Sequence, residues 1–111
     1  MKDSILYDDF SKLDIRVGKV MAASAPDWSE KLIRYEVDLG DEIGKRVLFS
    51  GIRKWYSPED LVGKNIPVIV NMAPKKMGDE ESAGMAIMVD TKEKPIMIFL
   101  GDDIELGTVI R

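Results

Sequence analysis

The chain has 111 residues, 45% of them hydrophobic and 32% charged, with 16 basic and 20 acidic residues that give a net charge of −4. This length and composition suit one globular core, so we expect a single domain spanning residues 1–111. No apolar run is long enough to cross a bilayer, no signal-peptide core follows the first residues, and there is no cysteine. Together these features predict a cytoplasmic protein that does not contact a membrane.

The first segment with a clear pattern is residues 14–21, where apolar and polar side chains alternate as in a half-buried strand. The alternation predicts that Ile15, Val17 and Met21 share one face. Gly18 interrupts the segment, and a glycine inside a strand suggests a bend or a bulge. We therefore expect a strand with a local irregularity near its centre.

The next two expected strands, residues 32–39 and 45–50, flank a turn at 40–44 and should form a hairpin. A short helix should follow, because Ser57 can cap a helix whose first position is Pro58. Three more strands are expected at residues 65–70, 85–89 and 96–100. Strands interrupted by one short helix between the third and the fourth predict an all-β fold, a five-stranded OB-fold Greek-key barrel with terminal extensions.

The inward-facing positions of these strands define the expected core. Several methionines fall on strand-periodic positions, so Met72, Met85 and Met88 are expected to fill gaps in that core. Tyr56 is expected to pack beside the short helix, whereas Trp28 is expected to be exposed. The strand residues that we expect to be buried are Ile15, Val17, Tyr35, Val37, Leu48, Val68, Val70, Ile87 and Val89.

The residue types that are missing limit the chemistry. The sequence has neither histidine nor cysteine, which excludes a Ser-His-Asp triad, a His or Cys nucleophile, and a zinc site built from their side chains. Acidic pairs at 8–9, 80–81 and 102–103 could bridge a hard cation, but adjacent acids are more often found in solvated turns. We therefore expect a binding protein and not an enzyme, with no cofactor and no metal.

Several motifs, taken in order, resemble the tRNA-binding OB-fold domain family. They are DIRVGKV at 14–20, EKLIRYEVDLG at 30–40, SGIRKWYSPEDLVGK at 50–64, VNMAPKKM at 70–77 and ESAGM at 81–85. This domain occurs as the C-terminal part or β subunit of methionyl-tRNA synthetase, in free tRNA-binding proteins and in the chaperone-like protein CsaA. The resemblance implies a module that recognises the backbone shape of tRNA and commonly forms homodimers.

An OB barrel offers one strand face and its flanking loops to a nucleic acid, with cations for phosphates and hydroxyls or small residues for close backbone approach. On this basis the resemblance assigns RNA binding to polar, cationic and small residues near the strand ends. They are Lys31, Arg34, Ser50, Gly51, Arg53, Lys54, Lys64, Asn71, Lys75, Lys76 and Ser82.

Apolar residues are concentrated near both termini, at 5–10 and again at 96–100 and 109–110. Pairing two copies would bury this surplus, so we expect a homodimer, with an aminoacyl-tRNA synthetase as a possible partner. These segments could instead cover the ends of their own barrel.

The expected binding loop has an unusual charge pattern. Lys75 and Lys76 are followed closely by Asp79, Glu80 and Glu81, and acids at this place should repel phosphate at the rim of an RNA groove. Affinity for nucleic acid rises with the number of phosphates neutralised, which the net charge of −4 also opposes. The main expectation is a tRNA-binding module, as a homodimer or as a synthetase-associated subunit. The alternative is a CsaA-like protein-interaction or chaperone dimer that binds extended peptides.

Overall fold

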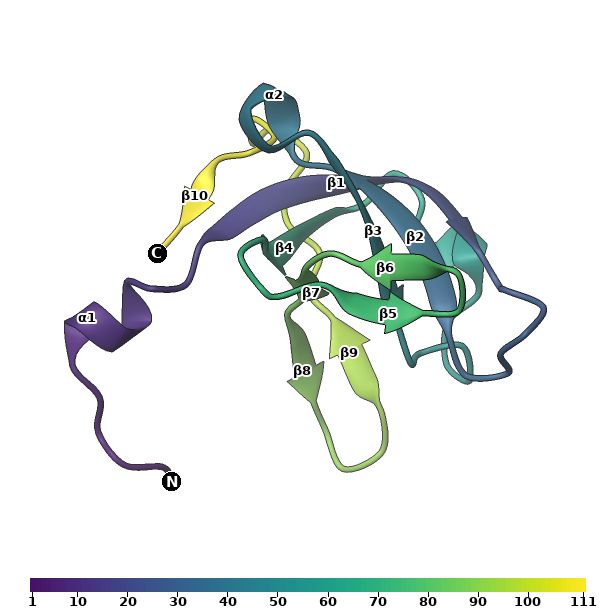
Figure 1. The fold of residues 1–111 in the computed structure, drawn as a ribbon, viewed down its shortest axis with the longest axis horizontal. Coiled ribbons are helices and arrows are strands. Elements are labelled where there is room, and N and C mark those ends of the chain that lie inside the picture. The colour runs from purple at the N-terminus through teal and green to yellow at the C-terminus, as the bar shows by residue number, and fades with distance from the viewer.

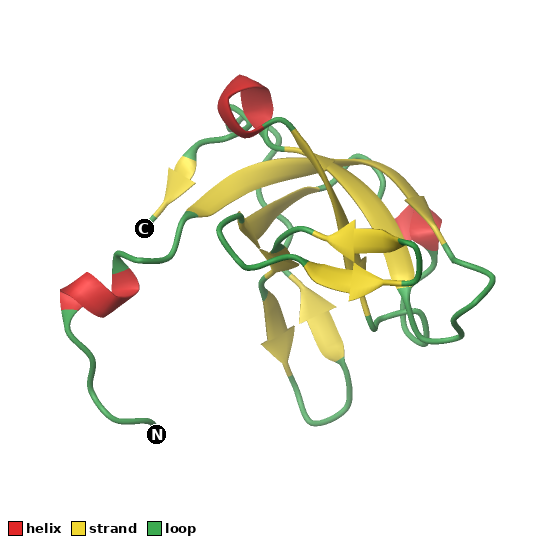
Figure 2. Cartoon of the chain, in the orientation of Figure 1, coloured by secondary structure: helices red, strands yellow, loops and turns green.

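The computed structural model describes all of residues 1–111, which form mainly strands joined by loops (Figures 1 and 2). The strands are β1 (Ile15–Ser24), β2 (Ile33–Asp38), β3 (Lys45–Ser50), β4 (Asn65–Ile69), β5 (Lys75–Met77), β6 (Glu80–Ser82), β7 (Met85–Ala86), β8 (Met88–Asp90), β9 (Pro95–Met97) and β10 (Val109–Ile110). The helical segments are α1 (Tyr7–Phe10), α2 (Gly40–Ile43) and the 3₁₀ turn η1 (Pro58–Asp60). None of these helices has the length and apolar character needed to span a membrane.

The main sheet runs in the order β3-β2-β1-β4-β7, with antiparallel neighbours. The long strand β1 curves over the barrel, pairing with β4 along its first half and with β2 along its second (Figure 1). The pairing of β1 with β4 is unbroken from Ile15 to Lys19, so Gly18 and Val20 face the barrel core, whereas Ile15 and Val17 are buried on the opposite face. A Cβ added at Gly18 would lie 2.4 Å from Val37 Cγ1, which explains the glycine, but the irregularity expected near it lies further along, between Val20 and Ala22. Met21, expected to share a face with Ile15 and Val17, is 49% exposed.

The sheet closes through the segment that follows the β5–β6 hairpin. The Ala83 N–H donates to the Val47 carbonyl at 3.0 Å, and the Phe49 N–H donates to Ser82 Oγ at 3.1 Å. On the other side of this segment, β7 pairs with β4. The segment therefore joins β3 to β4 and takes the place of the fifth strand of a nearly closed barrel. This arrangement confirms the predicted OB-fold class.

Most of the strand residues expected in the core are buried, and the two exceptions among them follow β7. Ile87, whose N–H still donates to the Pro67 carbonyl of β4, is partly buried, and Val89 is 49% exposed because β8 leaves the barrel to pair with β9 in a separate hairpin. The turn expected at 40–44 contains α2. The fully buried large side chains are Tyr35, Ile33, Leu39, Leu48, Ile52, Leu61, Ile66, Val20, Val37 and Val68, together with the polar Asn65.

The expected helix after β3 is a single 3₁₀ turn. Ser57 occupies the N-cap and Pro58 the first position, as predicted, but the Ser57 side chain makes no cap hydrogen bond to the backbone of the turn. Instead, Asp60 Oδ2 accepts from the Ser57 N–H at 2.9 Å and from Ser57 Oγ at 3.1 Å. Leu61 follows η1 directly and is fully buried, so the turn closes one end of the barrel. Tyr56 packs against the core, and its hydroxyl accepts a hydrogen bond from the Met97 N–H at 3.0 Å.

Candidate nucleic-acid interface

The outer face of β2 and β3 is flanked by two loops, residues 25–32 between β1 and β2 and residues 70–84 between β4 and β7. In OB barrels this face and these two loops are the usual binding surface for oligonucleotides. Arg34 lies in the middle of the face, because the inward positions of β2 on either side of it are taken by core residues. Phe49 on β3 is its register partner.

Arg34 is paired with carboxylates on two sides. Its Nε and Nη2 donate to the two oxygens of Glu80 at 2.7 and 2.8 Å, and its Nη1 donates to Glu36 at 3.1 Å. The hydrogen bond from Arg34 holds the pKa of Glu80 below its usual value, and the same bond raises the pKa of Arg34. The expectation that these acids only repel phosphate missed this contact, because Glu80 lies 46 residues further along the chain.

Trp28 of the 25–32 loop contacts both strand β3 and the tip of the β5–β6 hairpin. The rings of Trp28 and Phe49 have centroids 5.9 Å apart and are tilted by 46°. Gly78, at the tip of the β5–β6 hairpin, has a φ of +61°, and a Cβ there would lie 2.9 Å from the Trp28 ring. Only glycine fits this turn against the indole, so Trp28 covers Phe49 and supports the hairpin tip. Trp28 is nevertheless more than half exposed, as expected.

A basic hollow of about 480 Å³ opens at one end of this face and is called the Lys31–Trp55 hollow here. It is lined by Glu30, Lys31, Gly51, Lys54 and Trp55, so two lysines outnumber one carboxylate. The ammonium of Lys54 lies 5.6 Å from the centroid of the Trp55 ring, and this ring is 39% exposed. The hollow therefore combines two lysines for phosphate with an indole on which a base could stack.

Ser50 borders this hollow beside Gly51 and shares a hydrogen bond of 2.6 Å with the buried Tyr35 hydroxyl. Burial raises the pKa of Tyr35 to about 12, while the hydrogen bond from Ser50 opposes that rise. The phenol therefore stays neutral and can donate to Ser50 Oγ. The Ser50 hydroxyl is then free to donate to a phosphate or a 2′-hydroxyl outside the barrel.

Three of the expected RNA-binding residues hold the scaffold together. The Arg53 guanidinium donates to the carbonyls of Pro26 and Ser29 and so fixes the 25–32 loop. Asn71 accepts from the Asp14 N–H at 2.8 Å and donates to a carbonyl of the N-terminal segment. Ser82 is buried on the closing segment, where it accepts the hydrogen bond from Phe49.

The remaining expected cations do not form one cluster. Lys75 borders an apolar hollow of about 260 Å³, whose lining includes Phe49, Met72, Met77 and Met85. Met85 is 49% exposed and Met72 is also exposed, so the expectation that these two methionines fill the core was wrong. They line a surface groove because they fall at the edges of the short strand β7 and the 70–84 loop.

Lys76 and Lys64 lie outside both hollows. Lys76 is the register partner of Glu81 across the β5–β6 hairpin, so opposite charges face each other there. The Lys64 ammonium lies 5.4 Å from the ring centroid of Phe99 and lines none of the surface hollows.

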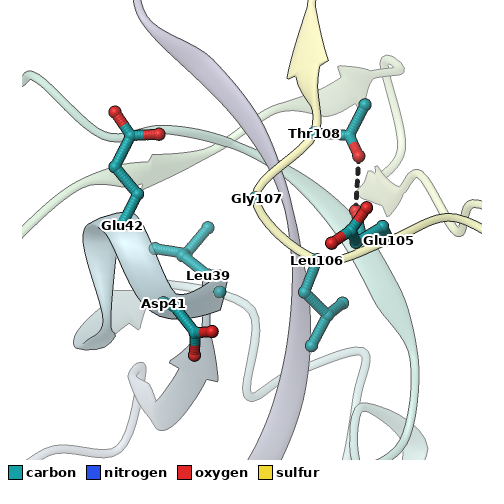
Figure 3. A pocket seen from close by; sticks show the side chains of 8 residues that line it. Leu39, Asp41, Glu42, Glu105, Leu106, Gly107 and Thr108 are labelled. Carbon is teal, nitrogen blue, oxygen red and sulfur yellow. Dashed lines mark hydrogen bonds between the residues drawn. The ribbon is translucent and has the colours of Figure 1, made fainter.

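A third hollow, of about 300 Å³ and with a polar lining, lies between α2 and residues 105–108 (Figure 3). Asp41 and Glu42 project from its α2 side, and Glu105 lies on the opposite side. Arg16 is the nearby cation, but it is paired with Asp14 at 2.6 Å and with Glu42 at 3.0 Å. Three carboxylates with no free cation make this hollow unsuited to RNA phosphate.

Residues 15–109 match a family model described as "Putative tRNA binding domain". The chain therefore belongs to the tRNA-binding domain family, in agreement with its OB barrel and the face just described. It is 40% identical over 110 residues to a methionine–tRNA ligase of Methanococcoides burtonii, a match that covers 98% of this chain. The chain spans only 16% of the length of that ligase.

Two solved structures show the same fold. A MetRS-related protein from Pyrococcus horikoshii superposes with a TM-score of 0.92 at 32% sequence identity, covering 99% of this chain and all of that one. The chaperone CsaA from Bacillus anthracis superposes with a TM-score of 0.85 at 30% identity, covering 98% of this chain and all of the other. The chain is thus similar over its whole length both to a MetRS-related protein and to a chaperone.

Proposed function

We propose that residues 1–111 act as one non-catalytic module that binds tRNA through the face of β2 and β3. The observation that carries this proposal is the Lys31–Trp55 hollow, where two unpaired lysines and an open indole adjoin the strand face. Cations beside a stacking surface are the usual means of binding a nucleic acid on an OB barrel. Membership of the tRNA-binding domain family supports tRNA as the RNA.

Apart from Arg34 and Lys64, the expected site residues divide into two roles under this proposal. Lysines 31, 54, 75 and 76 contact phosphate, and Ser50 donates to phosphate or to a 2′-hydroxyl where Gly51 lets the RNA backbone approach. Arg53, Asn71 and Ser82 position the loops that carry these contacts. Phosphate and sugar contacts of this kind fix the register of an RNA and read its shape more than its sequence.

We further propose that the module works as a homodimer or in association with an aminoacyl-tRNA synthetase in the cytoplasm. The N-terminal segment lies away from the barrel (Figure 1), and Tyr7 on α1 is 70% exposed. Between α1 and β10 there is a hollow of about 260 Å³ lined by Phe10, Leu13, Val109 and Ile110 among others. A second copy would bury this apolar surface. Light scattering should then give twice the 12.5 kDa of one chain, and the monomer mass at micromolar concentration would contradict the dimer.

A second candidate function is binding of extended peptides, as in a chaperone. The observation that favours it is the exposed apolar hollow lined by Met72, Met77, Met85 and Phe49, because flexible methionines suit a variable apolar partner. The structural likeness to CsaA is consistent with this reading.

A titration of bulk tRNA across a salt series tests the first function against the second. Four lysines on phosphates should give a slope of log affinity against log salt of roughly −3, at ~0.7–0.9 per phosphate neutralised. A labelled unfolded peptide provides the comparison, since apolar binding should depend little on salt. Absence of tRNA binding at low salt, with salt-independent peptide binding, would replace the first function by the second.

A further inference from the structure

We propose that Glu80 is an internal substitute for an RNA phosphate, which occupies Arg34 until RNA displaces it. The inference rests on the proposed tRNA-binding function. It assigns to Arg34 a phosphate subsite in the middle of the strand face, and to Glu80 the role of a competitor that sets how strongly and selectively this subsite takes RNA.

The geometry of the pair supports this assignment. Arg34 presents Nε and Nη2 to the two oxygens of Glu80 at 2.7 and 2.8 Å, which is the two-pronged arrangement that guanidinium forms with carboxylate and phosphate alike. Glu36 holds the third nitrogen, Nη1, from the same strand. Glu36 thus orients the guanidinium, while Glu80 fills the side that faces the hairpin.

The position of Glu80 on the β5–β6 hairpin makes it the acid that can be exchanged. It comes from a separate two-stranded hairpin, whereas Glu36, whose side chain is equally exposed at 44%, lies on the same strand as Arg34. Glu81, the next residue, forms no ion pair with Arg34 and faces Lys76 across the hairpin. Of the three acids on this hairpin, Asp79, Glu80 and Glu81, only Glu80 is paired with Arg34 and can compete with phosphate for its guanidinium.

Displacement has a consequence for the salt dependence of RNA binding. When a phosphate takes the place of Glu80, the RNA releases a counterion, but the freed carboxylate gathers a cation in exchange. The Arg34 contact therefore adds little to the net number of ions released by the wild-type protein. A variant without the Glu80 charge should show the full contribution of this contact.

The test compares Glu80→Gln with Asp79→Asn, a control that removes the same charge from the same hairpin at a residue that takes part in no ion pair. Binding of bulk tRNA is measured by fluorescence anisotropy across a salt series. Releasing an exposed ion pair should tighten binding by about two- to fivefold at low salt for Glu80→Gln. Its slope should steepen by ~0.7–0.9, while Asp79→Asn keeps the wild-type slope and gains less than about twofold.

The same two substitutions are repeated in an Arg34→Gln background. There the advantage of Glu80→Gln over Asp79→Asn should disappear, because the residue for which Glu80 competes is absent. Circular dichroism melts verify that each variant is folded. The side-chain Nε–H signal of Arg34 in NMR spectra should shift when tRNA is added to the wild-type protein, as its partner changes from carboxylate to phosphate.

The outcomes separate this inference from the proposed function. Equal gains for Glu80→Gln and Asp79→Asn, or weaker binding by Glu80→Gln, would overturn the displacement of Glu80 while leaving tRNA binding intact. An advantage of Glu80→Gln that persists in the Arg34→Gln background would overturn it too. If neither the wild-type protein nor any variant binds tRNA at low salt, the proposed function fails and the inference fails with it.

Discussion

The barrel body and the rim of the RNA face use their cations differently. In the body, Arg16, Arg34, Arg46 and Arg53 all donate to carboxylates or backbone carbonyls of the protein itself. At the rim, the lysines stand exposed, and Lys54 contacts only the face of its neighbour Trp55. The planar guanidinium suits fixed, multiple hydrogen bonds, which here are made to groups of the protein itself, whereas the flexible ammonium makes a looser, solvated contact that is still open to phosphate.

This division explains how an acidic chain can present a basic surface. The net charge of −4 counts arginines that are already neutralised by Asp14, Glu42, Glu36 and Glu80. Two unpaired lysines in one hollow then create a local positive site that the total charge does not reveal. The sign of the net charge therefore does not decide whether this barrel binds RNA.

The largest expected effect is on the free energy of unfolding at alkaline pH. It comes from Tyr35 in the barrel body, whose hydroxyl is hydrogen-bonded to Ser50 at the rim. The unfolded chain releases the Tyr35 proton near pH 10, whereas the folded protein holds it until the pKa of about 12. The stability from the neutral buried phenol is therefore complete below pH 10 and lost as the pH rises to 12. The free energy of unfolding, measured by urea denaturation, should fall by roughly 2–3 kcal/mol over this range on account of Tyr35.

The control for this pH effect is Tyr35→Phe. It removes the titrating group and leaves Ser50 at the edge of the hollow, where solvent can reach it. The part of the alkaline loss that belongs to Tyr35 should vanish, while the part due to lysines should remain. Identical pH profiles for the two proteins would show that Tyr35 is not the buried acid described here.

The next largest effect on the free energy of unfolding is expected for Arg46, one of the arginines of the barrel body. Arg46 on β3 donates from Nη1 to the carbonyls of Val70 and Ala83 at 3.2 and 3.3 Å and thereby ties the closing segment to the barrel. Replacing it with glutamine should lower the free energy of unfolding by about 1–2 kcal/mol, because two carbonyls lose a charged donor. Lys45→Gln, at the exposed neighbouring position, should change it by less than about 0.5 kcal/mol. Equal effects of the two changes on denaturant unfolding would contradict this contrast.

Much of the fold could be predicted from the sequence because period-two alternation is local. The first four barrel strands and most of the core follow from it. The face of β1 that points into the barrel could not be predicted, since Ile15 and Val17 on one face and Val20 on the other are all buried. The exposure of Val89 depends on the pairing of β8 with β9, which an alternating pattern does not specify.

Less of the candidate site could be predicted from the sequence. Residue types identified Lys31 and Lys54, but their meeting with Trp55 in one hollow depends on the fold. Arg53 has the residue type of an RNA contact, and only the structure reveals that its guanidinium fixes a neighbouring loop. The pairing of Arg34 with Glu80 crosses from a strand to a distant hairpin, so no local pattern could indicate it.

The rim can be tested by removing both lysines of the Lys31–Trp55 hollow. The double variant Lys31→Gln, Lys54→Gln should weaken tRNA binding by about tenfold at low salt and flatten the salt slope by roughly 1.5, since two phosphate contacts are lost. The free energy of unfolding should change little, because both side chains are exposed and take part in no ion pair. An unchanged slope would mean that RNA does not enter this hollow.

The smallest effect is expected at Lys64, which marks the limit of the RNA face. Its ammonium packs against Phe99 and lines none of the hollows, although it was among the expected RNA-binding residues. Lys64→Gln should therefore change tRNA affinity by less than about twofold, through the long-range loss of one charge alone, and should leave the salt slope unaltered. Lys54→Gln, measured beside it, removes an equal charge from inside the hollow and should flatten the slope by ~0.7–0.9. If the two variants flatten the slope equally, the RNA extends past η1 to the β9 end of the barrel, and the face is wider than the β2–β3 surface.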